Sequence, residues 1–158
     1  MKFAASIGRA FAAIVLTGIV SSLIFAVGFT VVGLAQSGKR DLTGIVEFVS
    51  AIWFVGAIIA LACAIIIGLG VEWPKSYWLL KRSSAGWWIS LIISLLAAEA
   101  LLHSFFLAEI AARGMGSPDL AGSLVFSASA AAVGGACSAA FWWWLVVMPG
   151  RNGRGSTA

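Results

Sequence analysis

Four long apolar stretches constrain what this chain can fold into more than any other feature of its sequence. They cover about residues 10–35, 45–71, 85–110 and 120–148. A helix needs roughly 20 predominantly apolar residues to cross the hydrocarbon core of a bilayer, and each stretch reaches that length. The sequence therefore predicts an all-α integral membrane protein, whose four transmembrane helices pack as a small bundle in a single domain over residues 1–158.

The composition excludes a water-soluble fold. Hydrophobic residues make up 61% of the chain and charged residues only 10%, whereas soluble domains carry about 25% charged residues. The segments between the apolar stretches are too short to fold alone, so any chemistry must lie in the membrane or at its two surfaces. The first apolar stretch is well beyond the roughly 7 to 15 residues of a signal-peptide core, so we expect a retained transmembrane helix.

The basic residues predict how the bundle is oriented. The formal net charge is +4, but these residues lie in short loops and tails, which fits the positive-inside rule better than nucleic-acid binding. With the N-terminus in the cytoplasm, the outer surface holds Lys39, Arg40 and Arg113. The inner surface then holds seven basic residues: Lys2, Arg9, Lys75, Lys81, Arg82, Arg151 and Arg154. We therefore expect both termini in the cytoplasm, a flexible tail over residues 150–158, and a bacterial inner membrane as the location.

Tryptophan residues support the same orientation. Indole rings favour the membrane interface, because the ring is apolar and its N–H donates a hydrogen bond. The loop over residues 72–82 mixes aromatic and basic side chains, which indicates a segment that lies along the lipid headgroups. An alternative is an aromatic surface against which a partner subunit or a pigment packs. The predicted interfacial belt consists of Trp73, Trp78, Trp87, Trp88, Trp142, Trp143 and Trp144.

The last apolar stretch carries the strongest helix-packing pattern. Small residues at intervals of four let helix backbones approach closely in lipid. This pattern predicts a helix surrounded by other helices, although the same small residues also make room for a bound lipid, quinone or pigment. The two predicted hairpins share one topology and place Cys63 and Cys137 at similar depth, which is a weak repeat signal. The small-residue stripe is Ser123, Ser127, Ala131, Gly135 and Ala139.

Glu99 and His103 are the most unusual residues of the third stretch. Residues four apart share a helix face, so the two side chains can touch. An ionised acid at a helix centre costs roughly 2.5 to 3.5 kcal/mol on insertion scales, and we find no lysine or arginine in another stretch that would neutralise it. A neutral hydrogen-bonded pair is the favoured state. The pair lies opposite a stripe of small residues, so we expect it to face away from the bundle.

Four interpretations of this pair remain open. It contacts another subunit, it is the proton site of a small transporter, it supplies a metal, haem or chlorin ligand through His103, or it only stabilises packing. A single histidine in each chain cannot supply two axial ligands without a second chain. The first interpretation is favoured, because bare lipid is a poor environment for these groups.

The sequence does not support an enzyme. It contains no nucleophile–base pair, no phosphate-binding glycine loop and no multidentate metal spacing. The leading hypothesis is a non-enzymatic accessory or assembly subunit of a larger membrane complex, whose partners are the lipid bilayer and either other integral membrane subunits or further copies of itself. A small oligomeric proton-coupled transporter or channel that uses Glu99 is the alternative. A further alternative is a subunit that holds a cofactor or pigment through His103. The cofactors considered are a lipid, a quinone, a chlorin and a haem.

Overall fold

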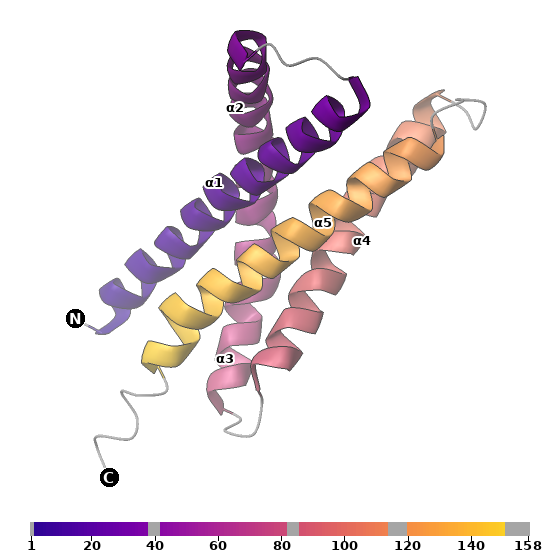
Figure 1. Ribbon diagram of the computed structural model, residues 1–158. Helices are drawn as coiled ribbons and strands as arrows, with labels where there is room; N and C mark the ends of the chain where they lie inside the picture. The colour runs from indigo at the N-terminus through magenta and orange to yellow at the C-terminus, as the bar shows by residue number, and fades with distance from the viewer. Residues whose placement is uncertain (1, 38–41, 82–85, 114–119, 151–158) are drawn as a thin grey trace.

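The computed structural model describes residues 2–37, 42–81, 86–113 and 120–150, and every one of these segments is helical apart from Gly86 (Figure 1). The predicted flexible tail lies outside the described residues from position 151 onward. The elements in chain order are α1 (Lys2–Ser37), α2 (Leu42–Ile67), η1 (Gly68–Glu72), α3 (Trp73–Lys81), α4 (Trp87–Arg113), α5 (Leu120–Trp142) and η2 (Trp143–Val147), where η marks a π-helical turn.

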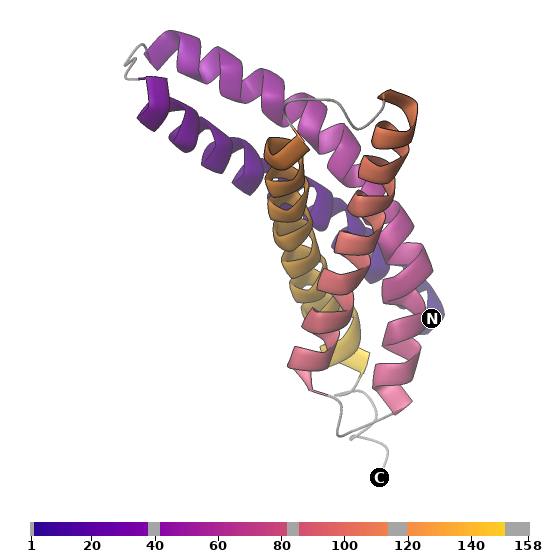
Figure 2. The same cartoon turned by 90° about the vertical axis from the view of Figure 1, so that its right-hand side faces the viewer.

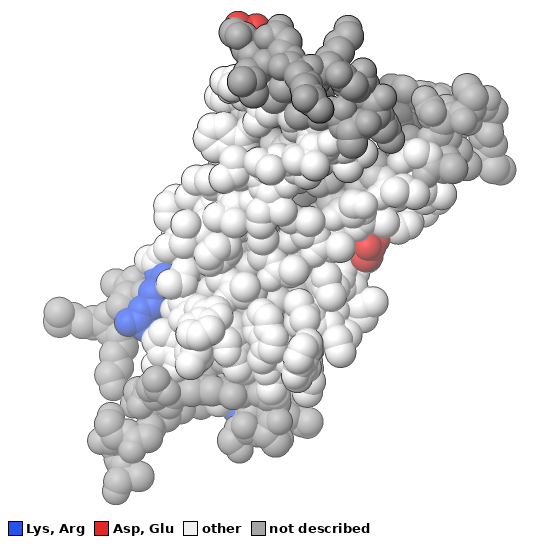
Figure 3. All heavy atoms as spheres, viewed as in Figure 1, with Lys and Arg blue, Asp and Glu red and all other residues white. Residues whose placement is uncertain are grey.

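Four of the described helical segments are long and apolar enough to cross a membrane, which confirms the predicted number of spans. They cover Ser6–Val32, Val49–Lys81, Trp87–Phe105 and Leu124–Gly150. Large apolar side chains are exposed on all four, as expected for helices that face lipid tails. The middle of the face shown in Figure 3 is uncharged apart from one basic patch at the left-hand edge and one acidic patch at the right-hand edge.

The helices form two hairpins that meet along α1 and α5. One hairpin consists of α1 and α2, the other of α4 and α5. The start of α1 and the last described residues after η2, which are the described termini, lie at the same end of the molecule as α3 (Figure 1). Towards the opposite end the two hairpins diverge, so that α2 and α4 separate in both views (Figures 1 and 2).

The core lies at the end that holds α3. Its largest buried side chains are Trp142, Leu79 and Val147, which pack with Ile14 and several alanines. A second, smaller cluster consists of Ile67, Ala98 and Ala131 and lies nearer the middle of the bundle. The end of the molecule with the termini is therefore well packed by large side chains.

The second span differs from the sequence prediction. The sequence predicts that residues 72–82 lie along the headgroups, but α2 continues through η1 into α3, and α3 buries Lys75, Ser76 and Leu79. A proline inside an α-helix clashes with the carbonyl four residues earlier and removes an amide donor. The π-helical turn η1 ends two residues before Pro74, with the Trp73 N–H bonded to the Gly68 carbonyl. This wider turn carries the helix through the proline, so the chain stays helical.

The same arrangement recurs at the end of the fourth span. In η2 the Met148 N–H bonds to the Trp143 carbonyl, and Pro149 follows directly. In the second helix of each hairpin, a π-helical turn is therefore followed by one further residue and a proline, and the described chain stays helical through the proline. π-helical turns are rare and frequently occur at functional sites. Both turns lie at the end with the termini, next to a group of buried polar side chains.

Candidate functional site

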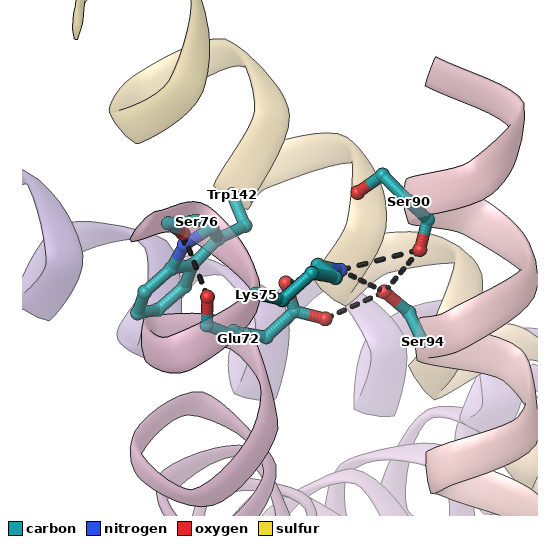
Figure 4. A network of polar contacts seen from close by, with 6 residues as sticks. All are labelled: Glu72, Lys75, Ser76, Ser90, Ser94 and Trp142. Atoms are coloured by element: carbon teal, nitrogen blue, oxygen red, sulfur yellow. Dashed lines mark hydrogen bonds and ion pairs between the residues drawn. The ribbon is translucent and has the colours of Figure 1, made fainter. Parts of the chain in front are cut away.

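A buried ion pair lies where η1 and α3 meet α4. Glu72 Oε2 and Lys75 Nζ are 2.6 Å apart, and their side chains are 0% and 3% exposed (Figure 4). The two residues are three apart on one helix, so they face the same side of it. A charge buried without a partner costs several kcal/mol, whereas a close pair in the same pocket offsets much of that cost.

Two serines of α4 complete the surroundings of this pair. Ser94 Oγ lies 2.5 Å from Glu72 Oε1 and 2.6 Å from Lys75 Nζ, and the Lys75 ammonium also donates to the Ser90 carbonyl at 3.2 Å. Ser94 is 2.8 Å from the same carbonyl. Because a hydroxyl has one proton, Ser94 accepts from Lys75 and donates to either the carboxylate or the carbonyl. The pair therefore joins α3 to α4.

A further contact joins α3 to α5. The Trp142 indole N–H donates to the Ser76 hydroxyl, and Ser76 donates to the Glu72 carbonyl at 2.6 Å. Trp142 is 1% exposed. We call Glu72, Lys75, Ser76, Ser90, Ser94 and Trp142 together the polar cluster (Figure 4).

The polar cluster is not fully satisfied. Ser90 Oγ is buried and has no hydrogen-bond partner in the described structure. Glu72 Oε2 approaches Lys75 closely but lacks hydrogen-bond alignment, so that contact is an ion contact. With its charges cancelled and its groups joined to three helices, the polar cluster is suited to fixing how these helices pack.

An apolar cavity of about 580 Å³ lies between the two hairpins, next to the second core cluster. All four long helices line it, with Phe25 from α1, Ile59 and Ile67 from α2, Leu102 from α4 and Phe126 from α5 among the larger side chains. Phe25 and Phe126 meet edge to face with ring centroids 4.7 Å apart. Within the described part of the chain the lining contains no charged side chain. The cavity is therefore suited to an uncharged, mostly hydrocarbon molecule.

Glu99 and His103 touch each other, as their spacing allows. His103 Nδ1 lies 3.2 Å from Glu99 Oε2 and 3.0 Å from the Glu99 carbonyl oxygen. The Glu99 side chain is 35% exposed and the His103 side chain 45%. Neither residue lines the cavity, as far as the described residues go, and neither belongs to the polar cluster. The structure thus brings the two together on a partly exposed flank of α4.

The residues of the small-residue stripe take different positions along α5. Ala131 and Ala139 are buried, and Ser127 is half-buried. Gly135 lies against α4, because a Cβ at this position would be 2.9 Å from the Leu95 Cα. The side chain of Ser123 lies outside the described residues.

Most of the predicted tryptophan belt lies at the end of the molecule that holds α3. The seven residues come from α3, the start of α4 and the end of α5 with η2. Trp73, Trp78, Trp88 and Trp144 are exposed, while Trp87 and Trp143 are half-buried and contact each other edge to face. Trp142 differs from the prediction: it is buried in the core and bonds to Ser76, so its indole N–H is satisfied by protein.

The polar cluster is the feature that sequence reasoning missed. Glu72 and Lys75 flank Trp73 and Pro74, a combination typical of a loop, so their opposite charges three residues apart suggest surface charges. One feature of the sequence could have indicated the polar cluster. Ser90 and Ser94 lie four residues apart on the third apolar stretch, so their hydroxyls share one helix face. Burying Lys75 also removes it from the predicted inner surface charges.

No metal site is evident among the described residues, because no three His, Cys, Asp or Glu side chains group together there. Comparisons with protein-family models, with curated proteins and with solved structures found no match.

Proposed function

We propose that this protein is a non-enzymatic accessory or assembly subunit of a larger membrane complex, and that it binds a partner through the flank of α4 that carries Glu99 and His103. The proposed location is a bacterial inner membrane with both termini in the cytoplasm. Removing the buried Lys75 from the seven predicted inner basic residues leaves six against three outer ones. That difference still supports the orientation.

The observation that carries this proposal is the partial exposure of an ionisable pair within a span. Both residues belong to the span Trp87–Phe105, and their side chains are 35% and 45% exposed. Their mutual contact satisfies only one carboxylate oxygen and one ring nitrogen. Polar groups inside the membrane are costly and normally face protein or a water-filled cavity. A polar side chain on a neighbouring transmembrane helix would satisfy the remaining atoms.

The alternative of a proton-coupled transporter has less support. A titrating acid on a transport path should face a polar cavity. Within the described residues, Glu99 lies outside the lining of the cavity, and that lining is apolar. The subunit proposal requires no such path.

Native mass spectrometry after gentle detergent extraction from the original membrane tests the proposal. We expect the chain to emerge within a larger assembly, and the double variant Glu99→Leu/His103→Leu to emerge alone, because it can no longer form interhelical hydrogen bonds. Ser50→Leu is the matched control, since Ser50 is an exposed polar residue on α2, and we expect it to stay in the assembly. An unchanged assembly in the double variant, together with loss of a transport phenotype, would refute the proposal and favour the transporter.

A further inference from the structure

The apolar cavity between the hairpins has no part in the proposed contact at Glu99 and His103, so a role for the cavity does not depend on that contact. Its volume of about 580 Å³ falls within the roughly 300 to 1,000 Å³ of ligand pockets. Such pockets are mostly apolar and contain a few polar groups that orient the ligand. Polar side chains of the lining that make no hydrogen bond within the protein are suited to orienting a ligand in this way.

Two hydroxyls of the lining meet that description. Serine and threonine in membrane helices usually bond to a carbonyl of their own helix, as Ser21 and Ser22 do here at 3.4 and 2.9 Å. Thr17 and Ser138 also line the cavity and are 5% and 4% exposed. Neither makes a side-chain hydrogen bond within the described part of the chain. Neither oxygen is among the fully buried atoms that lack a partner, so each hydroxyl keeps some accessible surface at the lining.

The positions of these hydroxyls define the ligand chemistry further. Thr17 lies near the middle of the span Ser6–Val32, and Ser138 near the middle of Leu124–Gly150. A charged or zwitterionic headgroup at this depth would be costly, and the described lining holds no charge that could pair with it. An uncharged carbonyl oxygen can accept from a hydroxyl without that cost. The remainder of the molecule must be hydrocarbon to match the lining.

We propose that the cavity binds a neutral hydrophobic molecule of the bilayer whose uncharged carbonyl oxygen accepts hydrogen bonds from Thr17 and Ser138. Such a carbonyl occurs in isoprenoid quinones and in acylglycerols, and the chemistry of the lining is common to both.

Two glycines of the lining can be replaced by a larger residue that fills the cavity without disturbing the helices. Gly56 on α2 and Gly134 on α5 both line the cavity, and a Cβ at either position would meet no atom within 4 Å. We therefore expect Gly134→Leu to occupy the cavity while the bundle remains folded, and Gly56→Leu to repeat the effect from the opposite helix. Gly28→Leu is the matched control, since Gly28 also has open space but lies on α1 outside the lining.

The experiment measures thermal stability of the purified full chain in mild detergent, with a decyl-substituted benzoquinone or a short-chain diacylglycerol added. A ligand that binds the folded state raises Tm. We expect one of the two probes to raise the Tm of the wild-type protein and of Gly28→Leu, and to have no effect on Gly134→Leu or Gly56→Leu. Ser138→Ala should bind the same probe roughly 3- to 10-fold more weakly, because it loses one hydrogen bond.

The pattern of Tm responses identifies the ligand class or refutes the proposal. A response to the quinone alone assigns the quinone class, and a response to the diacylglycerol alone assigns the acylglycerol class. No response of the wild-type protein to either probe overturns the proposal, as does an equal response in all variants, which indicates nonspecific partitioning. If Ser138→Ala and Thr17→Val bind as tightly as the wild type, the assigned role of the two hydroxyls is wrong.

Discussion

Gly134 and Gly135 are neighbours on α5, yet a Cβ added to each would meet very different surroundings. At Gly134 it would meet no atom within 4 Å, whereas at Gly135 it would lie 2.9 Å from the Leu95 Cα and 3.0 Å from the Ser94 carbonyl oxygen. Both of these atoms belong to the α4 backbone, which cannot move aside as a flexible side chain would. Gly135 is therefore needed for the close approach of α4 and α5, whereas Gly134 borders the cavity.

This difference predicts opposite effects for the same substitution. Gly135→Ala should destabilise the fold by about 1 to 3 kcal/mol, the usual cost of overpacking a close contact. Gly134→Ala should be neutral or stabilise it by about 1 kcal/mol or less, because alanine restricts the unfolded chain. Denaturant unfolding in mixed micelles, followed by tryptophan fluorescence, measures both. Equal effects of the two variants would show that α4 and α5 are not in backbone contact at Gly135.

The Glu72–Lys75 pair makes a second prediction at the level of single residues. Lys75→Met leaves the Glu72 carboxylate buried without its cation, and breaking a buried pair in this way costs about 3 to 5 kcal/mol. The double variant Glu72→Gln/Lys75→Met carries no charge, so it should be clearly more stable than Lys75→Met alone. The same unfolding measurement compares them. If the single and double variants unfold alike, the two side chains are not paired.

At the level of elements, α3 is the segment whose position the sequence did not reveal. The four spans could be predicted, because each long apolar run permits little besides a transmembrane helix. The burial of α3 could not, because Lys75 is neutralised by Glu72 of η1 and both groups are hydrogen-bonded to Ser94 of another helix. Such compensation exists only once the helices are packed. The π-helical turn before Pro74 was equally hidden, since proline after Trp73 usually indicates a helix boundary.

The burial of α3 predicts a pattern of chemical accessibility. Ser76 is buried and the adjacent Tyr77 is exposed. In a Cys63→Ala/Cys137→Ala background, Tyr77→Cys should therefore react quickly with a membrane-impermeant maleimide, and Ser76→Cys should react at least about 10-fold more slowly. Similar labelling rates at both positions would therefore contradict the docked helix.

At the level of the whole molecule, the two ends of the bundle differ. The end with the termini is fixed by the polar cluster and by Trp142, Leu79 and Val147. Towards the other end the hairpins diverge (Figure 2), with the cavity between them. The sequence predicted the small residues that pack α5 and the contact of Glu99 with His103. It could not predict the cavity, because its shape depends on how two hairpins diverge.

The partly exposed pair on α4 connects this architecture to the proposed function. The proposed partner contact lies within the membrane, because Glu99 and His103 both belong to the span Trp87–Phe105. The face with Glu99 and His103 is the part of that surface whose chemistry is least suited to lipid. Leu96 lies three residues before Glu99 on the same face and is 65% exposed. Leu96 is therefore a suitable position for a photocrosslinking residue that reacts with a bound partner.

The most direct measurement is photocrosslinking in the original membrane, with benzoylphenylalanine in place of Leu96. Phe54 on α2 is the control, because it is 66% exposed but lies on another helix. We predict a discrete protein adduct at position 96 that disappears in the Glu99→Leu/His103→Leu background, and only lipid adducts at position 54. Lipid adducts alone at both positions would contradict the claim that this face of α4 binds a partner.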